Sequence, residues 1–68
     1  MTFAEYAKTI DQRKLMALTG WCMGIEKHRQ WRGDKNFTVD QLPENEQERS
    51  IQKFEQAYEE EESFMYGA

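Results

Sequence analysis

Cys22 and His28 are the only cysteine and histidine of the chain, and a nucleophile with its base would be built from them. They lie six residues apart in a stretch of helical periodicity, which places them about 120° apart around a helix. A nucleophilic pair also needs an orienting third group and a cleft. We therefore expect a protein without catalytic residues, in which Cys22 is a small core residue.

Metal binding is also poorly supported by the residue types. Zinc sites gather cysteine and histidine, whereas Cys22 and Glu26 offer one soft and one hard ligand on adjacent turns. The run Glu59-Glu60-Glu61-Glu62 lacks the turn glycine and the ligand spacing of a calcium loop. We expect no metal site and no cofactor.

The carboxylates are unevenly distributed along the chain. Residues 1–35 carry seven basic and four acidic side chains, a charge of +3, and residues 36–68 carry two basic and nine acidic ones, a charge of −7, which together give −4. Such segregation favours antiparallel pairing of the two halves. On a helical wheel five glutamates share one flank of the second half, and we call them the acidic strip: Glu44, Glu48, Glu55, Glu59 and Glu62.

Two interpretations of the acidic strip stay open. Charge runs are commonly a solvated face that keeps a small protein in solution. Alternatively, carboxylates one or two turns apart, roughly 5–11 Å along the axis, can meet arginines placed for phosphates, as in a mimic of nucleic acid.

A second narrow apolar strip consists of Met16, Gly20 and Met23, and we call it the methionine strip. Methionine is an adaptable contact residue, and a glycine between two methionines permits close approach of another helix. The strip either contacts another protein or packs against residues 37–42 of the same chain.

The segment Lys27-His28-Arg29-Gln30-Trp31-Arg32 combines basic and aromatic side chains. Arginine beside an indole is used by binders of single-stranded nucleic acid and by protein hot spots. The net negative charge of the chain opposes nucleic-acid binding, so we favour ion pairs within the chain, followed by a protein contact through Trp31.

The elements that position these residues are predicted to be helices. Thr2 and Glu5 form a capping-box pattern, and apolar residues recur from Phe3 at helical spacing, which predicts one helix over residues 3–31. Gly20 and Gly24 weaken it and make Thr19-Gly20 the expected position of a bend. Lys14 lies within the apolar stripe, where it either extends to solvent or marks the boundary between two shorter helices.

The sequence predicts that the first helix ends at Gly33 and that residues 33–42 form a connection. A second helix is predicted over residues 43–65. Phe37, Val39 and Leu42 are apolar enough to pack against the helices. The predicted fold is an all-α hairpin of two main helices with a structured connection, forming one small domain, residues 1–68.

A chain of this length buries only about 60% of its unfolded surface, so we expect self-association. A homodimer with four main helices would cover the aromatic residues Trp21, Trp31, Phe54 and Tyr58. The single cysteine and the absence of a leader or long apolar stretch predict a cytoplasmic protein that does not contact a membrane.

These features together predict a non-enzymatic protein-binding module, an acidic inhibitor or modulator that docks on a basic surface of a larger protein. As an analogy of type only, this composition is shared by many phage-encoded proteins that bind and inhibit a host enzyme. Two alternatives are a nucleic-acid-binding regulator that uses residues 27–32 and a structural subunit that acts only in assembly.

Overall fold

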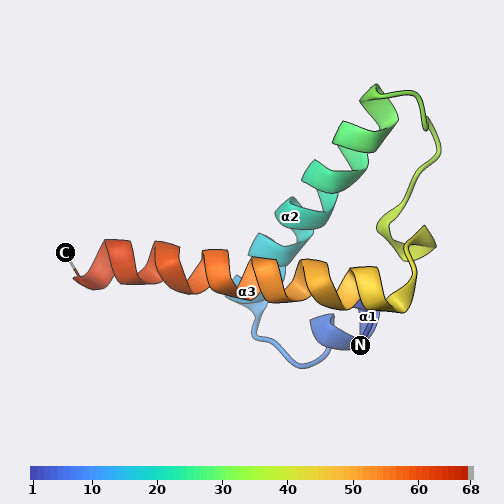
Figure 1. The fold of residues 1–68 in the computed structure, drawn as a ribbon. Helices are drawn as coiled ribbons and strands as arrows, with labels where there is room; N and C mark the ends of the chain where they lie inside the picture. The colour runs from blue at the N-terminus through green and yellow to red at the C-terminus, as the bar shows by residue number, and fades with distance from the viewer. Residues whose placement is uncertain (68) are drawn as a thin grey trace.

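The computed structural model describes the backbone of residues 1–67 and the side chains of residues 1–60. Its elements are the α-helices α1 (Phe3–Ala7), α2 (Gln12–Trp31) and α3 (Glu44–Gly67), and a short 3-10 helix, η1 (Val39–Gln41). Figure 1 shows α2 crossing α3, with the connection returning from the far end of α2 to the start of α3. No strand occurs among the described residues, and the predicted all-α hairpin is confirmed.

The predicted helix over residues 3–31 is divided into α1 and α2, and the division lies at residues 8–11 rather than at Thr19-Gly20. The capping box of Thr2 and Glu5 forms as expected. After one turn the hydroxyl of Thr9 donates to the Tyr6 carbonyl at 2.8 Å, so that this carbonyl is satisfied without a further helical turn. Asp11 then caps α2 by accepting from the Lys14 N–H at 2.8 Å.

The connection between α2 and α3 is held to α2 by side chains. Gly33 has a φ of 126°, a left-handed conformation that suits glycine and ends the helix as predicted. The carboxylate of Glu26 accepts the Val39 N–H at 3.0 Å, and the amide of Gln30 donates to the Phe37 carbonyl at 3.0 Å. These contacts bury Phe37 and Val39, as the sequence predicted.

Phe54 is the centre of an aromatic cluster at the crossing of the helices. It is 3% exposed, and its ring lies 6.3 Å from that of Tyr6, 5.8 Å from Trp21 and 5.8 Å from Tyr58 between centroids. Intramolecular packing therefore already covers Phe54, which the sequence assigned to a dimer seam. Tyr58 and Trp21 are half-buried, and the indole of Trp21 donates to the Ser50 hydroxyl at 3.0 Å.

Gln47 joins three parts of the chain from a buried position on α3. Its side-chain oxygen accepts the Phe3 N–H at 3.0 Å, and its nitrogen donates to the Leu42 carbonyl at 2.8 Å. Because the first amides of a helix have no partner within it, Gln47 supplies the acceptor that α1 needs. The start of α3 is thereby held against α1.

Candidate functional site

The first half of the acidic strip faces the start of the chain. The Met1 amine donates to Glu48 at 2.6 Å and to Glu44 at 3.2 Å. The hydrogen bond to Glu48, followed by that to Glu44, holds the pKa of the amine above its ordinary value. Both glutamates remain more than half exposed, so they can still meet a charged group from outside.

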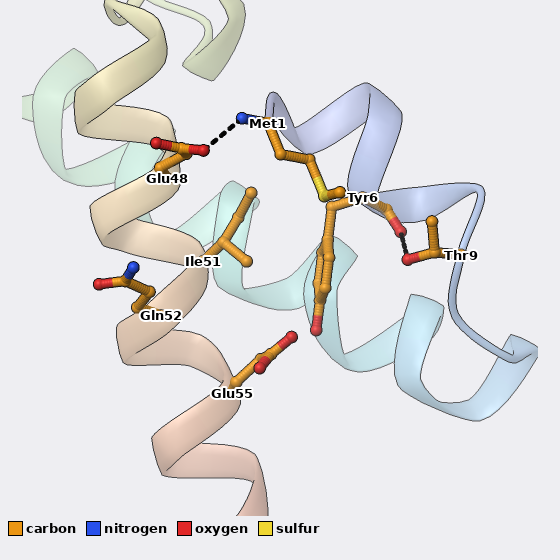
Figure 2. A pocket seen from close by; sticks show the side chains of 7 residues that line it. All are labelled: Met1, Tyr6, Thr9, Glu48, Ile51, Gln52 and Glu55. Atoms are coloured by element: carbon orange, nitrogen blue, oxygen red, sulfur yellow. Dashed lines mark hydrogen bonds and ion pairs between the residues drawn. The ribbon is translucent and has the colours of Figure 1, made fainter.

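A pocket of about 440 Å³ opens between α1 and α3 beside this ion pair (Figure 2). Its lining is Met1, Tyr6, Thr9, Glu48, Ile51, Gln52 and Glu55. Figure 2 shows the Tyr6 hydroxyl and the Glu55 carboxylate directed toward one another at one end of the pocket. The acidic strip thus borders a partly apolar recess.

The Tyr6 hydroxyl is buried, and none of the described side chains completes a hydrogen bond with it. Burial, followed by the neighbouring Glu55 carboxylate, raises the pKa of Tyr6 above its ordinary value. The hydroxyl therefore lies within electrostatic reach of Glu55 and Lys14.

Lys14 lies between two aromatic rings. Its ammonium is 5.7 Å from the ring centroid of Tyr6 and 5.4 Å from that of Tyr58, within reach of a cation–π interaction. The Tyr6 hydroxyl raises the pKa of Lys14, and the more distant charges of Glu55 and Glu59 act in the same direction. The position of Lys14 in the apolar stripe is therefore explained by aromatic contact close to the start of α2.

The methionine strip is open along much of its length. Met16 is 71% exposed and Met23 46%, and a side chain added at Gly20 would meet no atom within 4 Å. The strip therefore does not pack as a unit against residues 37–42. Met23 borders a shallow apolar groove of about 270 Å³ that also involves Ala4, Ala7 and Leu15.

In the basic-aromatic segment, Arg29 and Gln30 contact Phe37 of the connection, whereas Trp31 is exposed. The Arg29 guanidinium lies 4.8 Å from the ring centroid of Phe37, which ties it to the connection. Trp31 is 83% exposed, and its ring is 6.4 Å from that of His28. Among the predicted contact residues, Trp31 is the large apolar side chain most available to a partner.

Cys22 is half-buried in the core of the hairpin. Burial, followed by the charges of Glu26 and Asp40, raises the pKa of its thiol to about 11. A thiol with such a pKa is protonated at neutral pH and is a poor nucleophile. Within the described part of the chain, no group of three potential metal ligands comes together.

The structure thus brings Glu44 and Glu48 together at the Met1 amine, and it places Glu55 at the pocket and Glu59 exposed on the next turn. The side chain of Glu62 lies outside the described residues. Sequence reasoning missed Met1, Tyr6 and Gln47, because nothing local to these residues indicates their partners.

No family model, curated protein or solved structure matches the chain. The fold and the site therefore define only a class, a small all-α protein with an acidic helix face. Among the described residues, no helix combines the length and the apolar character needed to cross a lipid bilayer.

Proposed function

We propose that the protein is a non-enzymatic protein-binding module, an inhibitor or modulator that docks on a basic surface of a larger protein. The observation that carries this proposal is the charge and position of α3. This helix has eight glutamates against Arg49 and Lys53, which leaves a charge of −6. Figure 1 shows its C-terminal half extending beyond α1 and α2, where a partner can reach it.

The acidic strip supplies orientation in this proposal, and apolar residues supply contact area. Exposed charges mainly steer association and fix its register, while a few desolvated side chains provide most of the binding free energy. Met16, Met23 and Trp31 are exposed and suit the second role. The glutamates of the acidic strip also recur at intervals of one or two turns along one helix. This spacing suits a basic groove of the partner protein that otherwise binds a nucleic-acid backbone.

The test compares two double variants with the same change in charge. E55Q/E59Q neutralises two of the five glutamates of the acidic strip, whereas D40N/E46Q neutralises two exposed carboxylates away from it. Immobilised wild-type protein and both variants are used to capture proteins from a bacterial lysate at moderate salt, with identification by mass spectrometry. We expect one dominant protein to be retained by the wild type and by D40N/E46Q and lost by E55Q/E59Q.

The rate at which the captured protein associates with each variant provides a second readout. Because exposed charges act on encounter, E55Q/E59Q should slow association and reduce its salt dependence. Equal association rates for the two variants would contradict a role for the acidic strip.

A second candidate function is nucleic-acid binding near Trp31. The exposed indole lies beside His28 and one residue before Arg32, and aromatic stacking with nearby cations is the usual mode for single strands. Titration with a thymidine oligonucleotide at low salt should then quench Trp31 fluorescence, in a Trp21→Phe background, and salt should reverse the quenching. Unchanged fluorescence would remove this candidate.

A further inference from the structure

The pocket between α1 and α3 combines apolar walls with a carboxylate toward each end. Ile51 and Tyr6 are 7% and 4% exposed, and Figure 2 shows Ile51 on one side of the pocket and the Tyr6 ring on the other. Glu48 and Glu55 border it from α3, seven residues and about 10 Å apart along the helix. Its volume of about 440 Å³ lies within the range of about 300–1,000 Å³ that is usual for ligand pockets. A ligand with an apolar stem and a positive charge would match this lining.

The two carboxylates differ in their partners. Glu48 accepts the Met1 amine at 2.6 Å, whereas Glu55 forms no ion pair with any of the described side chains. The Tyr6 hydroxyl, which is buried and completes no hydrogen bond with a described side chain, is directed toward Glu55. Lys14 contacts the Tyr6 ring but does not line the pocket. Glu55 is therefore the half-buried carboxylate of the pocket that can accept a cation from outside.

Arginine is the side chain whose chemistry fits this lining. Its methylene groups can lie along Ile51 and Tyr6, and its guanidinium can donate two parallel hydrogen bonds to the Glu55 carboxylate. The amide of Gln52, which also lines the pocket, offers a further acceptor oxygen. Lysine has a comparable stem, but its ammonium is a point charge that is strongly hydrated and cannot make the bidentate pair.

We propose that the pocket receives one arginine side chain from the basic surface on which the protein docks. This inference rests on the proposed function and specifies it, because the acidic strip guides the approach and the pocket at Glu55 then binds one arginine of the partner. Arginine is enriched among the few desolvated residues that provide most of the binding free energy of an interface. Glu59, one turn further along α3, does not line the pocket and acts only on the approach.

A peptide titration tests the pocket without the partner protein. The probe is the terminally blocked tripeptide Gly-Arg-Gly, added to ¹⁵N-labelled protein and followed by NMR, and matched peptides carry lysine or uncharged citrulline instead of arginine. A ligand of this size should bind with a dissociation constant on the order of 1–10 mM. We expect saturable shifts at the amides around Tyr6, Ile51 and Glu55 with the arginine peptide, weaker binding of the lysine peptide and none of the citrulline peptide. Glu55→Gln should weaken arginine binding at least about tenfold.

Two variants without a change in charge separate the pocket from the acidic strip. Gln52→Phe places a ring at the pocket, whereas Gln56→Phe places the same ring one turn further along α3, outside the pocket lining. Both glutamines are exposed, and circular dichroism with urea unfolding checks that both variants keep the fold. Gln52→Phe should abolish the saturable shifts, and Gln56→Phe should retain them.

Three results would overturn the inference. These are equal affinities for the arginine and lysine peptides, unsaturated shifts spread over the acidic face, and arginine binding that survives Gln52→Phe. The titrations need no captured protein, so they are independent of the test of the proposed function. Failure of the pocket while E55Q/E59Q still loses its target would remove only the arginine site, whereas specific arginine binding without a captured target would contradict only the proposed function.

Discussion

Gln47 offers a sharp test of how α1 and the connection are held to α3. We consider Gln47→Met, because methionine has a similar length and no branch, so it fills the same volume without either hydrogen bond. The substitution leaves the Phe3 N–H and the Leu42 carbonyl without their partner.

The expected loss of stability is large for a chain of this size. Each buried polar group without a partner costs about 1–3 kcal/mol, so two of them should lower the free energy of unfolding by about 2–6 kcal/mol. At the usual stability per residue, a chain of 68 residues has a total of about 3–10 kcal/mol. Gln47→Met should therefore remove a large part of the stability of the fold.

Urea unfolding monitored by tryptophan fluorescence measures this effect. A Trp31→Phe background leaves Trp21 as the reporter, and its indole is packed against Phe54 and bonded to Ser50. Gln52→Met, on the same helix but exposed, is the matched control and should change the free energy of unfolding by no more than about 0.5 kcal/mol. An equally small change for Gln47→Met would refute the bridging role of Gln47.

Three further predictions follow. Cys22 should react with a thiol reagent at neutral pH far more slowly in the folded chain than in urea, because its pKa is about 11, and equal rates would contradict its burial. Gly20→Ala should stabilise α2 by about 0.5–1 kcal/mol, whereas Gly33→Ala should destabilise the chain because Gly33 has a positive φ. Thermal unfolding should therefore give a higher midpoint for Gly20→Ala than for Gly33→Ala, and the opposite order would contradict these backbone conformations. Since the folded-state pKa of the Met1 amine is raised, its contribution to stability is complete below the unfolded pKa of about 8 and is lost as pH rises through the folded pKa. Between pH 7 and about 10, the unfolding midpoint should thus fall more for the protein with a free amine than for the N-acetylated protein. Intact mass confirms that Met1 is present. Parallel curves of midpoint against pH for the two proteins would exclude the ion pair.

The sequence alone determined the helical class and most of the local boundaries. The capping box at Thr2, the stop at Gly33 and the burial of Phe37 and Val39 were predictable because each depends on residues only a few positions apart or on simple hydrophobicity. Two shorter helices had been left open only with a boundary at Lys14, and the break at residues 8–11 was not predicted, although Asp11 is a good capping residue. Apolar residues keep their helical spacing across residues 8–11, and this continuity indicated a single helix in spite of Asp11.

Tertiary structure alone decided which groups meet across the chain. The Met1 amine donates a hydrogen bond to Glu48, which lies 47 positions away in the sequence, and Gln47 accepts one from the Phe3 N–H, 44 positions away. Lys14 lies between the rings of Tyr6 and Tyr58. Helical periodicity indicates which face of a helix is apolar, but it does not fix the angle and the height at which two helices cross. Those two quantities set every one of these contacts, and they arise from packing around Phe54 that no local pattern specifies.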